Sequence, residues 1–286
     1  MKATQGLFKY LDASKLIFFE KRLLLLTPPK YLNDPWDFLP KGRIPSEDET
    51  LKIWLENEKQ IARSSAIALP IDFAVHEQQN RLKEIRSDFT SKEFLAEQGK
   101  NYQNEMGKSV GITSLTELPA CRLMWAHYAQ SYTGFVVELA AGEIGNFANF
   151  VICGMGTGLV AVKVKYPPGF KQIQIAEDAG NVLELCCTKH PSWKYEEEWR
   201  IIAPLRGSVP CRLVANDGRE EKRFCVRFKP ENIRRVIFGM RMHPETKKRL
   251  CTMLAQVDFQ NVVKQVTDID HETGKLVLKS FSNLEK

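Results

Sequence analysis

The chain has 286 residues, of which 43% are hydrophobic and 27% are charged. Such values are typical of a folded globular protein, so they exclude a long disordered or fibrous chain. Lys and Arg outnumber Asp and Glu by 41 to 35, which gives a net charge of +6. Because the basic residues form no long run, this excess permits an anionic ligand or a nucleic acid but requires neither.

The sequence contains no pattern of a signal peptide or a membrane span. Its most apolar early stretch, "KLIFFEKRLLLLTPP", is interrupted by Glu20, Lys21 and Arg22, which is unlike a secretory signal. No segment approaches the roughly 20 apolar residues that a membrane-spanning helix needs. We therefore expect a cytoplasmic protein without a membrane partner.

The seven cysteines show no C-x-x-C pair of the kind that holds structural zinc. In a cytoplasmic protein we expect reduced thiols, most of them buried as small hydrophobic side chains. The sequence accordingly predicts no metal site.

Predicted strands and helices follow one another along the chain. Residues 7–10 and 22–27 have strand character, and "DASKLIFFEK" between them has apolar residues at helical spacing. Residues 46–108 are rich in Glu, Lys, Gln, Ala and Leu and contain two capping-box patterns, Ser46 with Glu49 and Thr90 with Glu93. We expect a helical insertion or layer there.

Beyond Gly111 the residue pattern becomes typical of strands. Two further helices are predicted, over residues 176–189 and from Pro244 to Leu254. The strand segments are "GITSL", "GFVVEL", "LVAVKVKYP", "EEEWRII", residues 223–228, "RRVIFG" and the two halves of "VVKQVTDIDHETGKLVLKSF". The chain is therefore expected to be one α+β domain, residues 1–286, with a largely antiparallel central sheet.

Two short segments each allow a structural and a functional interpretation. Asn33 and Asp34 precede Pro35 and Trp36, a pattern that favours turns but also occurs in binding loops. In "LMWAHYAQ", His127 is suited to binding a phosphate or relaying a proton, yet a histidine among aromatic residues is often a packing residue. "GMGTG" at 154–158 leads into a strand, so it is interpreted as a turn and not as a phosphate-binding loop.

The segment "SWKYEEEWRIIAP" places three carboxylates directly before a strand-like run. If it is extended, Glu196, Glu198 and Arg200 share one face, and Glu197 points to the other. On an exposed strand this would be a salt-bridge ladder of ~0.2–1 kcal/mol. In a cleft, one carboxylate could act as a general acid or base, or could stabilise a positive charge on a substrate.

Several motifs in order give the chain a family resemblance. They are "FKY", "PPKYLNDPWD", "LMWAHYAQSYTGFVVEL", "VKVKYP", "WKYEEEWRII" and "FKPENIRRVIFG". Together they resemble a bacterial family known as domain of unknown function 2971 (DUF2971), along nearly the whole chain. The activity of that family is not established, so the resemblance implies no mechanism.

In layout the chain also resembles ADP-ribosyltransferase-like toxins, which have a polar residue on a first strand and a glutamate on a late strand. That resemblance implies NAD as co-substrate, with no permanently bound cofactor. Glu198 or Glu196 would be the catalytic carboxylate, and His127 would assist. The residues that would contact NAD are Tyr10, Tyr128, Trp125, Tyr31, Asn33, Asp34 and Arg200.

Three function classes therefore remain. The first is ADP-ribose transfer to a protein or nucleic acid, or cleavage of NAD. The second is a non-catalytic sensing or interaction module in bacterial stress or phage defence. The third, a metal-dependent nuclease or hydrolase, is least favoured because none of the five histidines is closely paired with another. A catalytic site requires Glu198 near Tyr10 or His127 at a pocket, whereas the module predicts these groups buried and paired without one.

Overall fold

A computed structural model describes residues 6–44, 46, 48–49, 52, 91–140, 142–144, 147–150, 159–169, 179–214 and 220–281. The chain divides into two compact units. The first comprises Met1–Phe38, Met106–Phe170 and Cys186–Lys286, and the second comprises Leu39–Glu105 and Lys171–Leu185. The strands and the candidate site all belong to the first unit.

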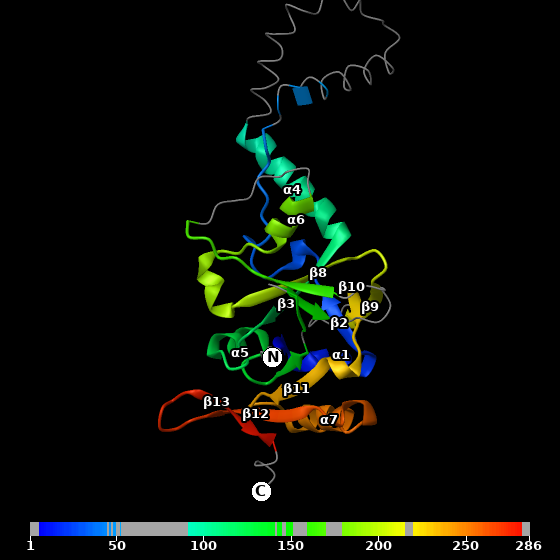
Figure 1. Cartoon of the computed structure of the whole chain (residues 1–286), viewed down its shortest axis with the longest axis vertical. Coiled ribbons are helices and arrows are strands. Elements are labelled where there is room, and N and C mark those ends of the chain that lie inside the picture. Colours follow the sequence, from blue (N-terminus) through cyan, green and yellow to red (C-terminus); the bar gives the residue numbers. More distant parts are fainter. Residues whose placement is uncertain are drawn as a thin grey trace, which may run out of the picture. The chain divides into compact units, whose positions relative to one another are not determined.

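Within the described residues, ten strands form one sheet in the order β13-β12-β11-β4-β1-β3-β8-β7-β6-β5. Neighbouring strands are antiparallel except β11 and β12, which are parallel. Figure 1 shows the carboxyl-terminal strands in orange and red. The strands are β1 (Leu7–Leu11), β3 (Val110–Thr116), β4 (Phe135–Leu139), β5 (Gly142–Ile144), β6 (Phe147–Phe150), β7 (Leu159–Lys163), β8 (Glu198–Pro204), β11 (Ile233–Phe238), β12 (Val263–Ile269) and β13 (Leu276–Ser280).

A smaller sheet has the order β2-β10-β9 and is formed by β2 (Leu23–Leu26), β9 (Val209–Val214) and β10 (Glu220–Arg227). Its two longer strands are joined by a disulfide bond between Cys211 and Cys225. The prediction that every cysteine is a reduced thiol is therefore wrong for this pair. The antiparallel pairing of β9 with β10 brings the two sulfur atoms together, and sequence spacing alone did not indicate it.

The helices of the described residues are mostly short. The α-helices are α1 (Ile17–Lys21), α4 (Lys92–Ser109), α5 (Arg122–Tyr128), α6 (Ala179–Cys186) and α7 (Pro244–Leu254). The 3-10 helices are η1 (Ala13–Leu16), η2 (Pro29–Tyr31), η4 (Pro191–Glu196), η5 (Pro230–Asn232) and η6 (Val257–Phe259). Helix α7 begins as predicted with Pro244 in its first turn, where the missing amide hydrogen has no helical partner.

The main core lies on one face of the large sheet, where α1 and α7 cover it. Phe18 and Phe19 of α1 and Leu250 and Leu254 of α7 pack with the inward side chains of β4 and β11. Aromatic rings fill much of this space, and Phe19 contacts both Phe135 and Phe259. On the other face, a second cluster gathers Phe8 and Tyr10 of β1 around α5.

The prediction of an α+β fold with a largely antiparallel sheet is confirmed. Helix α4 supports the helical character of its part of residues 46–108, but most of that block, like "GMGTG", lies outside the described residues. A single domain with a helical insertion stays a prediction. None of the helices that could be assessed is long and apolar enough to cross a membrane.

Candidate functional site

The candidate site lies where the large sheet forks beside β3. Strands β1 and β3 share one register pair, Phe8 with Thr116. At the other end of β3, Ile112 exchanges two backbone hydrogen bonds of 2.8 Å with Thr27, the residue after β2. Between these points β1 and β3 diverge, and Lys9 Nζ donates across the gap to Ser114 O at 2.9 Å.

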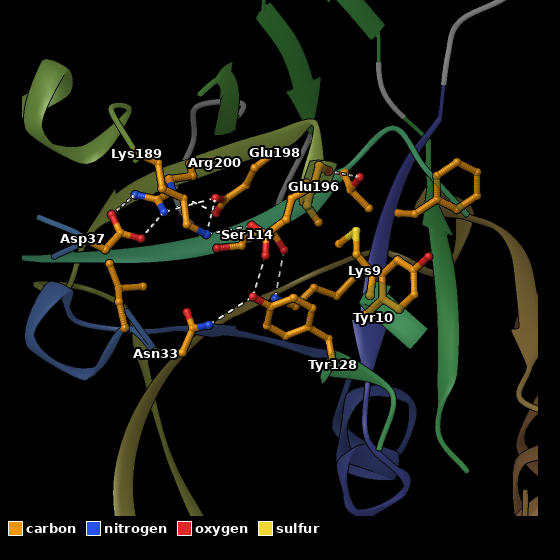
Figure 2. Close-up of a pocket in the computed structure, with 15 residues that line it drawn as sticks. Lys9, Tyr10, Asn33, Asp37, Ser114, Tyr128, Lys189, Glu196, Glu198 and Arg200 are labelled. Atoms are coloured by element: carbon orange, nitrogen blue, oxygen red, sulfur yellow. Dashed lines mark hydrogen bonds and ion pairs between the residues drawn. The ribbon is translucent and has the colours of Figure 1, made fainter. Parts of the chain in front are cut away.

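A cavity of about 70 Å³ opens at this fork, and we call it the fork cavity. Its polar lining includes Lys9, Tyr10, Ser114, Tyr128, Glu196 and Glu198. Drug-sized ligands occupy roughly 300–1,000 Å³, so the fork cavity in this structure has room for a few water molecules or one small polar group. Figure 2 shows the charged side chains converging on it.

Glu197 explains how two acids reach the same cavity. Helix η4 ends at Glu196, Glu197 adopts a left-handed conformation with φ 41° and ψ 52°, and β8 begins at Glu198. Glu196 and Glu198 are each only 3% exposed, whereas Glu197 pairs with Lys163 at 3.2 Å. The structure brings Glu196, Glu198 and Arg200 to one cavity, but not along one strand face, because Glu196 lies in a 3-10 helix.

Arg200 is fully buried. Its guanidinium forms a two-pronged pair with Asp37, in which Nη1 donates to Oδ1 at 2.9 Å and Nη2 donates to Oδ2. Its Nε donates to Glu198 Oε1 at 2.8 Å, and Nη1 also donates to Cys186 O at 2.8 Å. Charge-assisted bonds of this geometry are the strong ones in proteins, so Arg200 fixes β8 to the segment that carries Asp37.

Lys189 joins the two acids. Its Nζ lies 2.7 Å from Glu196 Oε2 and 3.1 Å from Glu198 Oε2. The same ammonium lies 4.6 Å from the ring centroid of Trp193, a cation–π contact. Both carboxylates are therefore neutralised by buried cations.

The two acids nevertheless respond to this environment in opposite ways. Burial would raise the pKa of Glu198, but the charges of Arg200 and Lys189 outweigh it and lower that pKa to about 2. For Glu196, burial prevails over the charge and hydrogen bond of Lys189, and its pKa is raised. Glu198 is thus ionised at all ordinary pH values, and Glu196 is the acid that is ready to take up a proton.

Tyr128 closes the cavity opposite the lysine. Its hydroxyl donates to Glu196 Oε1 at 2.6 Å and accepts from Asn33 Nδ2 at 3.0 Å. Burial and the nearby charge of Glu196 raise the pKa of Tyr128, so the phenol stays protonated and keeps donating. Figure 2 shows Asn33 beside the hydroxyl of Tyr128, which points toward Glu196.

Lys9 is the third cation of the fork cavity. Desolvation by burial lowers its pKa to about 8, against the opposing effect of the Glu198 charge. An amine with this pKa is neutral in an appreciable fraction of molecules at physiological pH.

Residues 124–201, which include Tyr128, Lys189 and the Glu196–Arg200 segment, match a family model described as "Protein of unknown function (DUF2971)". The predicted DUF2971 resemblance is confirmed over this segment. No curated protein and no solved structure matched the chain. The resemblance to ADP-ribosyltransferase-like toxins stays a prediction.

The matched segment supplies two of the cavity's three acids, Glu196 and Glu198, and one of its two tyrosines, Tyr128. Six residues singled out in the sequence line the cavity. Besides Glu196 and Glu198, the lining contains Tyr10, Asn33, Tyr128 and Arg200. Tyr10 donates to Leu118 O at 2.8 Å and meets Trp125 edge-on.

The other predicted site residues do not line the fork cavity. Trp125 is buried behind Tyr10, and Asp34 is buried and accepts from Trp36 N in a turn. Tyr31 is 57% exposed and lies near Lys30 and Arg223. His127 is exposed on α5.

Sequence reasoning missed Lys9, Asp37, Ser114 and Lys189. Asp37 is the last residue of the motif "PPKYLNDPWD". In the structure it pairs with Arg200, so the need of a buried arginine for an acidic partner was the signal that could have identified it. Lys9 lies inside "FKY", where an exposed strand lysine was the simpler interpretation. No local pattern marks Lys189 or Ser114.

Proposed function

We propose that the fork cavity is the active site of an enzyme that cleaves the bond between nicotinamide and ribose in NAD and passes ADP-ribose to a macromolecular acceptor or to water. One observation carries this proposal: two carboxylates line a single cavity, and their environments displace their pKa values in opposite directions. Pairs of this kind are how enzymes assign separate acid–base and charge-stabilising roles.

Glu198 is the charge-stabilising member. In the reaction the carbon–nitrogen bond breaks, its electron pair leaves with nicotinamide, and the ribose carbon becomes positively charged. A carboxylate that stays ionised in a water-poor cavity stabilises that charge far more than it could in bulk water. Arg200 and Lys189 hold Glu198 in place on both sides.

Glu196 is the proton-accepting member. The acceptor hydroxyl, amine or water bonds to the same ribose carbon and gives up a proton, which Glu196 takes. Its raised pKa brings it closer to neutrality, where a general base is most effective. Tyr128 orients the carboxylate by its 2.6 Å hydrogen bond.

The size of the cavity sets a condition on this reaction. A volume of about 70 Å³ admits a small part of NAD at most. The proposal therefore requires the wall around Leu32 and Asn33 to move outward on binding. Asn33 is exposed, and its side chain donates a hydrogen bond to Tyr128, so an outward movement of Asn33 breaks this contact.

The test is release of nicotinamide from labelled NAD by the purified protein and three variants. We expect Glu198→Gln to lower the rate at least ~100-fold, the usual scale for loss of an electrostatic catalytic group. Glu196→Gln should lower it by a similar factor or less. Glu197→Gln is the matched control, because this neighbouring acid points away to Lys163, and it should leave the rate unchanged.

Two results decide against the enzyme. One is a folded wild-type protein that releases no nicotinamide and shows no NAD binding by calorimetry. The other is equal release by wild type and Glu198→Gln. NAD binding without release would keep the site and would direct the search to the missing acceptor.

A second candidate, a non-catalytic sensing or interaction module, is favoured by a different observation. Both acids are buried and each has direct cationic partners, which is also what a purely structural network requires. On this account Glu198→Gln lowers stability, and no variant alters any reaction of NAD.

A further inference from the structure

Lys9 lies between two cavities. It lines the fork cavity and also a neighbouring cavity of about 160 Å³, whose lining includes Leu23, Leu24 and Leu25 of β2. Tyr10 and Tyr128 belong to both linings as well. An amine in this shared wall can be reached by a small molecule from either side.

The contacts of Lys9 leave most of its hydrogen-bonding capacity unused. Its Nζ donates to Ser114 O at 2.9 Å. Among the residues with described positions, Lys9 forms no ion pair with a carboxylate, whereas Lys189 and Arg200 are each paired directly with acids. An ammonium has three donors, and this bond uses one of them.

The charges around Lys9 balance in two alternative ways. With every group ionised, the cations of the fork cavity are Lys9, Lys189 and Arg200, and the anions are Asp37, Glu196 and Glu198. Moving one proton from Lys9 to Glu196 leaves two cations and two anions, so the net charge is unchanged. In the second cavity Lys15 and Asp12 pair with each other at 3.5 Å, and the phenols of Tyr10 and Tyr128 stay neutral because burial raises each pKa.

The second arrangement is chemically useful, because it provides a neutral amine and a protonated carboxyl in one cavity. Burial favours this arrangement at both residues, because burial lowers the pKa of Lys9 to about 8 and raises the pKa of Glu196. A nucleophilic lysine requires this kind of desolvated site. Glu196 lines the same cavity and is the acid that can give a proton to a molecule that reacts with the amine.

We propose that Lys9 is a nucleophilic amine that forms a covalent imine with a small aldehyde admitted to the fork cavity. The Lys9 nitrogen bonds to the carbonyl carbon, and the carbonyl oxygen takes a proton from Glu196. The Lys9 nitrogen, now positively charged, returns one of its protons to the Glu196 carboxylate, which gives a neutral carbinolamine. Glu196 then donates that proton to the carbinolamine hydroxyl, the carbon–oxygen bond breaks, water leaves, and a protonated imine remains. The step is a condensation without oxidation or reduction, and it does not depend on NAD.

The test uses glycolaldehyde, whose few atoms fit a cavity of about 70 Å³, with cyanoborohydride to trap the imine. The full-length protein is treated at pH 7, and each lysine is followed by peptide mass spectrometry. The exposed Lys248 and Lys275 are internal references. A pKa of about 8 instead of 10.5 gives roughly three-hundredfold more neutral amine at pH 7.

Allowing for restricted access, we expect Lys9 to be modified at least about tenfold faster than the references, with a rate that rises with pH to a midpoint near 8. Labelling of Lys9 that is absent, or no faster than that of Lys248 and Lys275, would overturn the proposal. This comparison is made in the wild-type protein, so it does not depend on a variant that folds.

Two variants separate the parts of the mechanism. Lys9→Arg keeps a cation that can reach Ser114 O but cannot form an imine, so the fast site should disappear while the circular dichroism spectrum stays the same. Glu196→Gln should slow the labelling of Lys9 and not that of the reference lysines, whereas Glu197→Gln should slow neither. An unchanged Lys9 rate in Glu196→Gln would contradict the role of Glu196 as proton donor.

Discussion

At the scale of single residues, Glu197 has the largest influence on the site. Its left-handed backbone turns the chain between η4 and β8, so that Glu196 and Glu198 both point inward. The alternation of side chains along a strand predicted the same grouping from the sequence, but Glu196 lies in a 3-10 helix and not in a strand. The grouping was predictable because residues two apart share a face in a strand, and the turn at Glu197 produces the same result.

The position of His127 shows where local reasoning was insufficient. Helix α5 buries Met124 and Trp125 and partly buries Tyr128, which follows Met124 by four residues. At about 100° per residue, His127 falls beside this buried stripe and faces outward. The aromatic residues of "LMWAHYAQ" did not indicate which side chains of this segment would meet the sheet.

Tyr128→Phe tests the hydrogen bond that holds Glu196. Removing the hydroxyl removes a donor that favours the ionised carboxyl, so the pKa of Glu196 should rise further, by about one unit. The measurement is a carbon-13 NMR titration of labelled glutamate. Tyr195→Phe is the matched control, because within the described residues its hydroxyl makes no hydrogen bond, and it should leave the Glu196 pKa where it is. Equal effects of the two variants would contradict the account.

At the scale of elements, most strands were predictable and their arrangement was not. Segments such as β1, β2, β4 and β12 are short apolar or alternating runs, and such runs predict strands on local grounds. The order of strands in the sheet depends on pairings between distant segments. The fork beside β3, which creates the cavity, is a property of that order and has no local signal.

The pair of Asp37 with Arg200 ties two elements that are 163 residues apart in sequence. Asp37→Asn removes one charge from a fully buried pair, so the free energy of unfolding should fall by about 3 kcal/mol, measured by urea denaturation. As a control, Glu20→Gln breaks the exposed pair with Arg249 and should leave stability nearly unchanged. A loss in Asp37→Asn as small as in the control would mean that Arg200 does not hold the two elements together.

At the scale of the whole molecule, composition indicated a folded globular protein and the order of predicted elements indicated the α+β class, and the first unit contains the complete fork cavity. Its buried charges also make stability depend on pH. Because the pKa of Glu198 falls from 4.5 to about 2 on folding, its stabilising contribution is present above pH 4.5 and is lost as the pH falls toward 2. Sequence reasoning found Glu196, Glu198 and Arg200, but not Asp37, Lys189 or Lys9, since the partners of these three lie far along the chain or are spaced without a pattern.

The account depends on two neighbouring acids in one cavity whose pKa values are displaced in opposite directions, and an NMR titration of the glutamate carboxyl carbons tests this most directly. Glu196→Gln and Glu198→Gln identify the two signals. We predict that Glu198 stays ionised down to about pH 2 and that Glu196 titrates above its ordinary value of 4.5. If both signals titrate together near 4.5, the two acids lie in equivalent, solvated surroundings, and the central claim is wrong.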